Sequence, residues 1–145
     1  MKKILIIFLA LMFSCKTSTN TAGSVPFKIA DNYFVKNTQT VNLPVEKVIT
    51  SKQEFDKIFG TAAHMGESGI PTAIDFSKDQ VIAVMLPVTG ISTEIVPVKL
   101  VKTHPAEAEF HYKIKSGEKL SYTIKPSVLL IVDKEYKMIR FNKQE

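Results

Sequence analysis

The sequence predicts a mostly β domain of the α+β class, in which an antiparallel sheet curls into a small sandwich or barrel with one short helix packed on it. Three observations support this prediction. Apolar and polar residues alternate in several short segments between residues 41 and 142, turn residues separate these segments, and one segment has helical spacing. Short strands at such close spacing are typical of sandwiches and small barrels.

The size and charge of the chain limit the number of domains and the kinds of partner that we expect. Its 145 residues suffice for one domain of ordinary size. Of the 19 Lys and Arg residues, Lys2 and Lys3 lie in an N-terminal leader, so the rest of the chain carries 17 basic residues against 14 acidic ones. The two signs are intermixed without a run of either. We therefore expect no nucleic acid among the partners.

The first 14 residues have the organisation of a bacterial signal peptide. Lys2 and Lys3 precede an unbroken apolar run of ten residues over 4–13. A membrane-spanning helix needs about 20 apolar residues, so a shorter run followed by polar residues fits a cleaved leader. The alternatives are a plain secretory signal cut near Ala22 and an uncleaved anchor.

The end of the leader resembles a bacterial lipobox, with the residues Met12-Phe13-Ser14-Cys15. Cys15 is the only cysteine, and lipidation accounts for it. We expect cleavage before Cys15 and a lipid anchor in a bacterial membrane, with the domain outside the cytoplasm. Lys16 favours the outer membrane over the inner one. Residues 15–24 then form the lipidated cysteine and a flexible tether, and residues 25–145 form a single β-rich domain.

Two strands and a helix are predicted in the first third of the domain. Residues 33–35 form one strand-like piece. Residues 41–46 alternate as a half-buried strand, and Pro44 places that strand at a sheet edge. Ser51 and Glu54 have the spacing of a capping box, and the apolar spacing that follows predicts a helix over residues 52–59, ended by Gly60.

The remainder predicts an antiparallel meander. The continuously apolar runs at 80–86 and 128–132 indicate central strands. Between them, the sequence predicts a strand from Ile91 to Thr103, an alternating strand at 107–114, a turn at 116–118 and a strand at 120–124. Residues 138–142 are expected to return as the last strand.

Four features recur in one known family. They are a short aromatic helix at 55–59, an Asp-Phe-Ser segment at 75–77, a buried strand at 81–84 and a closing Lys-Pro-Ser-Val-Leu-Leu-Ile-Val at 125–132. In these features the chain resembles the C-terminal domain family of the protease-complex subunit PrcB. The resemblance implies a non-enzymatic, protein-binding role that stabilises a protease partner. It also implies a contact loop at Val88-Thr89-Gly90-Ile91-Ser92, where that family has a Gly-Gly-Tyr segment.

The candidate chemistry is sparse. The histidines at 64, 104 and 111 match no metal-ligand spacing, so we expect no metal and no cofactor. His111 is expected on the exposed face of a strand and His104 in a turn. Asp75 and Asp79 could serve acid–base chemistry, although a turn built on Asp75 explains them more simply.

Two loops, 61–73 and 87–93, are the predicted binding segments, because binding residues concentrate on loops held by a rigid scaffold. The candidate residues within them are His64, Met65, Glu67, Ser68, Ile70, Thr89 and Ile91.

The expected function is that of a membrane-anchored, non-catalytic lipoprotein that binds another protein, with an envelope protease as one such partner. The alternative is a small-ligand protein with its site in the mouth of the β domain, lined by Tyr112 and Tyr122. An enzyme ranks third, and it would need a cleft in which His64, Asp75 or Glu67 side chains converge and one of them has a shifted pKa.

Overall fold

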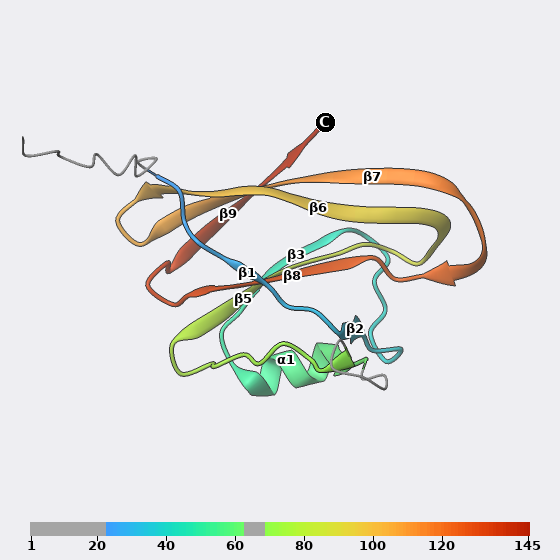
Figure 1. Cartoon of the computed structure of the whole chain (residues 1–145), viewed down its shortest axis with the longest axis horizontal. Helices are drawn as coiled ribbons and strands as arrows, with labels where there is room; N and C mark the ends of the chain where they lie inside the picture. Colours follow the sequence, from blue (N-terminus) through green and yellow to red (C-terminus); the bar gives the residue numbers. More distant parts are fainter. Residues whose placement is uncertain (1–22, 63–68) are drawn as a thin grey trace, which may run out of the picture.

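A computed structural model describes residues 23–62 and 69–145, and these residues are mostly β (Figure 1). In chain order, the elements are β1 (Lys28–Ile29), β2 (Tyr33–Val35), β3 (Val45–Ile49), α1 (Lys52–Ile58), β4 (Phe59–Thr61), β5 (Asp79–Met85), β6 (Thr89–His104), β7 (Glu107–Ile124), β8 (Ser127–Asp133) and β9 (Met138–Gln144).

The strands form open sheets that pack in layers, so the predicted sandwich is confirmed and the sheets do not close into a barrel. The central sheet has the order β1-β8-β5-β3, and the outer sheet has the order β6-β7-β9. A two-stranded sheet of β2 and β4 lies with α1 on the other side of the central sheet (Figure 1). No helix among the described residues is long and apolar enough to cross a bilayer.

The central sheet is apolar on both faces, which explains the unbroken apolar runs of β5 and β8. Ile82 and Val84 of β5 point into a core shared with the outer sheet. Val81 and Ala83 point into a second core shared with α1, β2 and β4. The prediction of two central strands is therefore confirmed, since β8 and β5 occupy the two inner positions of this sheet.

The predicted helix is present, although its end differs from the prediction. Ser51 caps α1, its hydroxyl accepting a hydrogen bond of 3.3 Å from the Glu54 amide. The helix ends at Ile58 without using Gly60 as a stop, because the chain passes directly into β4 and pairs with β2. Gly60 lies beneath the Phe34 ring, where a Cβ atom would come within 2.8 Å of Phe34 Cζ.

β6 and β7 form one long hairpin, and the turn predicted at 116–118 does not exist. Ser116 and Gly117 lie within β7, where the pairing with β6 shifts register between Ile91 and Thr93. A Cβ atom on Gly117 would meet Ser92 Cβ at 3.4 Å. Pairing along the partner strand outweighs the local turn signal here. The only turn of this hairpin is at residues 104–107.

The predicted meander is wrong after β7. β8 leaves the outer sheet for the central one, and β9 then returns to pair with β7 in parallel. The burial of the two strands explains this order, because β8 is buried on both faces while β9 alternates between exposed and half-buried residues. An edge position therefore suits β9.

The strand predicted at 41–46 is displaced along the chain. β3 covers Val45–Ile49, while Leu43 is exposed outside it. β3 is an edge strand, as Pro44 predicts, and Pro44 precedes its first residue.

Candidate functional site

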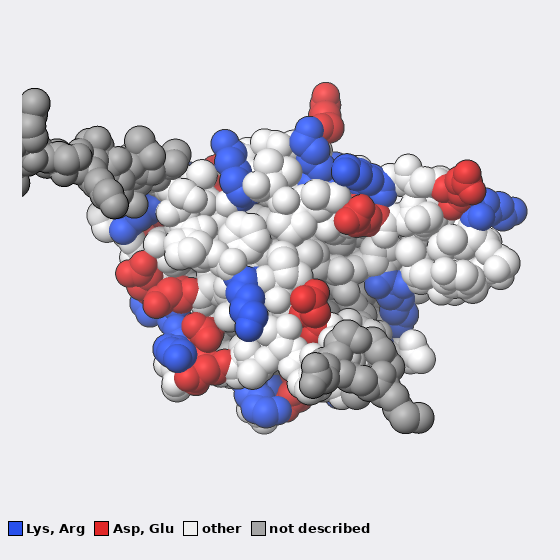
Figure 2. All heavy atoms as spheres, in the orientation of Figure 1, with Lys and Arg blue, Asp and Glu red and all other residues white. Residues whose placement is uncertain are grey.

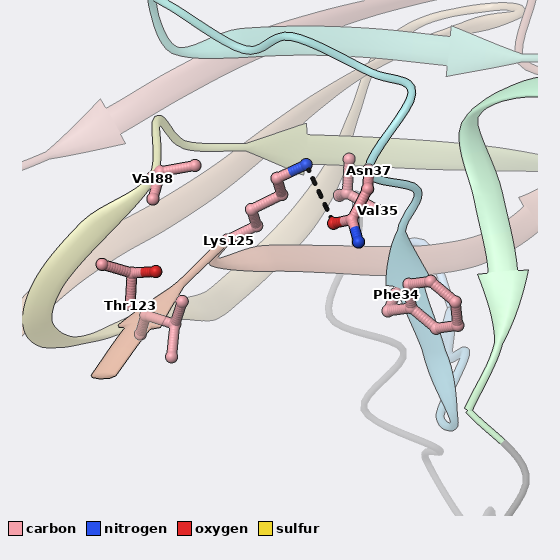
Figure 3. Close-up of a pocket in the computed structure, with 7 residues that line it drawn as sticks. Phe34, Val35, Asn37, Val88, Thr123 and Lys125 are labelled. Carbon is pink, nitrogen blue, oxygen red and sulfur yellow. Dashed lines mark hydrogen bonds between the residues drawn. The ribbon is translucent and has the colours of Figure 1, made fainter. Parts of the chain in front are cut away.

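A groove opens at the end of the sandwich where the chain crosses between the central sheet and the outer sheet. It consists of two adjoining hollows of about 330 and 340 Å³, and both are lined by Asn37, Val88 and Lys125. Figure 3 shows Lys125 reaching across the first hollow toward Asn37, with Val88 and Thr123 on its own side and Phe34 on the other.

The wall that carries Val88 and Lys125 is built from two links between the sheets. Val88 lies between β5 and β6, and Lys125 lies between β7 and β8. The Leu86 amide donates a hydrogen bond of 2.9 Å to the Pro126 carbonyl, and this bond joins the two links. The opposite wall is Phe34 of β2 and the segment from residue 37 to residue 42.

The amine of Lys125 holds the two walls together. It donates hydrogen bonds to the carbonyl oxygens of Lys36 and Gln39, at 3.2 and 3.3 Å, and lies 3.5 Å from Asn37 Oδ1. All three acceptors are neutral. The ammonium is therefore hydrogen-bonded while its positive charge has no carboxylate partner among the described residues.

The groove lies at the opposite end of β6 from the N-terminal segment. Ser24 forms an isolated antiparallel β-bridge with Val101, and the Val25 amide donates a hydrogen bond of 2.8 Å to the Leu100 carbonyl. These contacts place the start of the described chain near the 104–107 turn, on the left of Figure 1, whereas Val88 adjoins the other end of β6. The strand from Thr89 to Val101 spans at most roughly 40 Å.

Only some of the predicted binding residues belong to the part of the chain that the structure describes. His64, Met65, Glu67 and Ser68 lie outside the described residues. Ile70 is exposed, and its carbonyl accepts a hydrogen bond of 3.0 Å from the Asn32 amide group. Its side chain does not line either hollow of the groove.

The segment 87–93 is not a loop throughout, which corrects that prediction. Thr89 and Ile91 belong to β6, because the hairpin pairing extends to Thr89 opposite Ile124. The Thr89 hydroxyl accepts a hydrogen bond of 3.1 Å from the Ile91 amide. Neither residue lines the groove, and within this segment Pro87 and Val88 do.

The environment of His111 also differs from the prediction. Its imidazole is largely buried, with Nε2 2.8 Å from Glu109 Oε1 and Nδ1 3.2 Å from Gln144 Nε2. The sequence placed His111 on the exposed face of a strand, but β9 pairs alongside β7 and covers it. His104 lies exposed at the hairpin turn, as predicted. Its Nδ1 is 3.4 Å from Glu107 Oε2.

Asp75 forms a turn, which was the simpler of its two interpretations. Its Oδ1 accepts hydrogen bonds from the amide and the hydroxyl of Ser77, at 3.0 and 2.6 Å. These hydrogen bonds lower the pKa of the Asp75 carboxyl below its usual value. The Asp79 amide in turn donates to the Asp75 carbonyl at 2.8 Å, so the turn leads directly into β5.

Tyr112 and Tyr122 do not share a cavity, which corrects the proposed ligand site. Tyr112 is buried between the sheets, and its hydroxyl donates a hydrogen bond of 2.6 Å to Glu46 Oε1. Burial, followed by the Glu46 carboxylate, raises the pKa of Tyr112. The Tyr122 side chain is 62% exposed on the other half of β7.

Sequence reasoning did not identify Phe34 or Lys125 as site residues. An aromatic residue at the middle of a short strand and a lysine before a proline carry no local signal for a groove. Over residues 23–62 and 69–145, no three His, Cys, Asp or Glu side chains are arranged to hold a metal ion. Comparison of the chain with models of known protein families, with curated proteins and with solved structures gave no match.

Proposed function

We propose that this protein is a lipid-anchored, non-catalytic accessory protein of the bacterial envelope, which binds another protein in the groove around Lys125. The observation that carries the proposal is the position of the groove. It lies at the far end of β6 from Ser24, the point near which the proposed tether joins the domain.

The tether supports this arrangement by its length. From Cys15 to Gly23 the chain can extend at most about 28 Å. A lipid on Cys15 therefore keeps the Ser24 end of the domain close to the bilayer, and the groove, up to roughly 40 Å further along β6, is free to face away from it. A protein partner, and not the anchoring membrane, is then the natural occupant.

An envelope protease is the specific partner that we propose, and this step rests on the resemblance to the PrcB domain family described above. The alternative function is the binding of a small ligand in the same groove. Each hollow has a volume near the lower limit of ordinary ligand pockets, which is about 300 Å³. In the cell, the groove would contact a protein under the first function and a small molecule under the second.

Photo-crosslinking distinguishes them. A photoreactive residue is placed at Val88 in the full-length protein, in its own membranes, and a matched protein carries it at Val98. Both side chains are about half exposed, at 51% and 43%, and only Val88 lines the groove. We expect a discrete protein adduct from position 88 alone. Equal adducts from both positions, or none from position 88, would contradict the proposal.

The lipid anchor has its own test. Cys15→Ser removes the sulfur that carries the lipid, so we expect the variant to incorporate no labelled fatty acid and to lose its maturation by cleavage before residue 15. Radiolabelled palmitate and the mass of the purified protein measure the two effects. A Cys15→Ser variant that is still cleaved at that position and still labelled would exclude lipidation there.

A further inference from the structure

The lining of the groove has an unbalanced charge. It contains amide, hydroxyl and apolar side chains, one lysine, and no Asp or Glu. The groove therefore carries a net charge of one positive unit, at the amine of Lys125.

Lys125 donates to neutral acceptors, as Lys36 and Lys134 do, whereas three other lysines of the described residues are paired with carboxylates. For example, Lys47 Nζ lies 2.9 Å from Glu54 Oε1, and Lys78 Nζ lies 3.6 Å from Asp75 Oδ2. The three acceptors around Lys125 are neutral and stand at 3.2–3.5 Å. Hydrogen bonds between an ammonium and a carboxylate are typically shorter, at about 2.7–2.9 Å. A carboxylate entering the groove would thus give Lys125 a stronger partner than any it has.

Asn37 Oδ1 is the acceptor that such a carboxylate would replace. It is the most distant of the three, at 3.5 Å, and it belongs to an exposed side chain that can rotate away. The carbonyls of Lys36 and Gln39 would stay bonded to Lys125, so the walls of the groove would remain joined. Asn37 also lines both hollows, as Val88 and Lys125 do.

Apolar side chains flank the lysine on both walls. Phe34 is 45% exposed on one wall and Val88 is 51% exposed on the other (Figure 3). The amides of Gln39 and Asn42 and the hydroxyl of Thr123 add hydrogen-bonding groups beside them. This mixture matches an extended peptide, whose backbone needs hydrogen bonds and whose side chains alternate in direction.

From these features, and resting on the proposed function, we infer that the partner inserts an extended segment in which one Asp or Glu is flanked by apolar residues. The acidic side chain pairs with Lys125, and the apolar neighbours pack on Phe34 and Val88. A nucleic-acid strand fits less well, because its phosphates need several cations and this groove supplies one. Figure 2 shows acidic and basic residues intermixed over the visible face, without an extended positive area.

Synthetic peptides test the charge of the occupant. The probes are acetyl-Ala-Leu-Glu-Val-Ala-amide and its Gln and Lys counterparts, each carrying a fluorophore and titrated against the full-length protein in detergent. We expect the Glu peptide to bind at least about tenfold more tightly than the other two at low salt, and the difference to shrink at high salt because ions screen the pair. Equal binding of the Glu and Gln peptides, or no binding of any peptide, would overturn the inference.

Two pairs of variants locate the binding. Val88→Glu places a negative charge beside Lys125 and is expected to weaken Glu-peptide binding about tenfold, while Val98→Glu makes the same change on an exposed site outside the groove and is expected to leave it unchanged. Lys125→Met removes the charge, and Lys125→Arg retains it. Lys125 also joins the walls of the groove. If Lys125→Met does not fold for that reason, Val88→Glu alone provides the test. Unchanged binding by Val88→Glu would overturn the inference.

The outcomes also separate this inference from the proposed function. Suppose that position 88 still crosslinks to a protein while the peptides show no preference for Glu. The groove then binds a partner by other chemistry, and only the acidic segment is wrong. If position 88 crosslinks to no protein, the proposed function itself fails.

Discussion

The hydroxyl of Tyr112 donates a hydrogen bond of 2.6 Å to Glu46 Oε1, which joins the outer sheet to the edge strand of the central sheet. The Tyr112 ring is buried and stacks on Phe110 at a centroid distance of 5.6 Å. Only its hydroxyl reaches the polar edge of β3. The contact therefore links the two layers along the edge of the central sheet that β3 forms.

Removing this hydroxyl should weaken the sandwich. A hydrogen bond to a charged group contributes roughly 1.5–3 kcal/mol, and the exposure of Glu46 to water places Tyr112→Phe at the lower end, about 1.5 kcal/mol. Urea unfolding followed by circular dichroism measures the change. Tyr122→Phe is the matched control, since that side chain is exposed, and it should change the free energy of unfolding by less than about 0.5 kcal/mol. Similar losses in both variants would show that the contact with Glu46 adds no stability.

The same tyrosine should make the protein sensitive to high pH. Burial raises the pKa of Tyr112 above its usual value of 10.0, so the folded state retains a proton that the unfolded state releases. The resulting stability is fully present below about pH 10 and is lost as the pH rises from there toward the pKa in the folded state. Free energies of unfolding measured between pH 8 and pH 11 should fall less steeply in Tyr112→Phe than in the wild type. Parallel curves would contradict this expectation.

Gln80 is the buried polar side chain that holds the link between β8 and β9. Its Nε2 donates hydrogen bonds to the carbonyls of Tyr136, at 2.6 Å, and Asp133, at 3.2 Å. Gln80→Leu leaves the Tyr136 carbonyl buried without this donor, and we expect a loss of about 1–3 kcal/mol in unfolding experiments. Gln53→Leu on the exposed face of α1 serves as the control and should cost much less. If the two variants unfold at the same urea concentration, the buried hydrogen bonds do not support the link.

Phe34 and Gly60 are coupled, because the ring of one covers the backbone of the other. A Cβ atom at Gly60 would lie 2.8 Å from Phe34 Cζ, so Gly60→Ala must displace the ring. The ring is half exposed and can move, so we expect a loss of stability of only about 1 kcal/mol together with a changed groove wall.

A double-mutant cycle measures this coupling. In a Phe34→Ala background, Gly60→Ala should cost less than it does in the wild type, because the obstructing ring is gone. Gly90→Ala is the control, since the nearest atom to a Cβ there is the Tyr122 carbonyl oxygen at 4.0 Å. Strict additivity of the Phe34 and Gly60 changes would show that the ring does not constrain this position.

Parts of the fold follow from local pattern alone. The unbroken apolar runs at β5 and β8 predict strands that are covered on both faces, and the structure places both inside the central sheet. The capping residue Ser51 and the apolar spacing after it predict α1. By contrast, the Ser-Gly-Glu segment at 116–118 gives a turn signal, yet it lies within β7 because the long partner strand β6 pairs alongside it.

The groove could not be predicted in the same way, because its walls come from distant parts of the chain. Lys125 meets the carbonyls of Lys36 and Gln39, which are 89 and 86 residues away in sequence. Nothing local to Lys125 distinguishes it from other surface lysines. Of the predicted binding segments, 87–93 contributes Pro87 and Val88 to the groove, although its named candidates Thr89 and Ile91 belong to β6.

By itself, the sequence determined that β5 and β8 are strands with apolar residues on both faces, and where the short helix begins. These properties depend on the period of side chains along a few residues, and that period is written directly in the chain. Only the tertiary structure decided that β9 pairs in parallel with β7, that β2 pairs with β4, and that Phe34, Val88 and Lys125 share one groove. Such pairings depend on which strand edges meet when the two cores are buried together, and no local period specifies that choice.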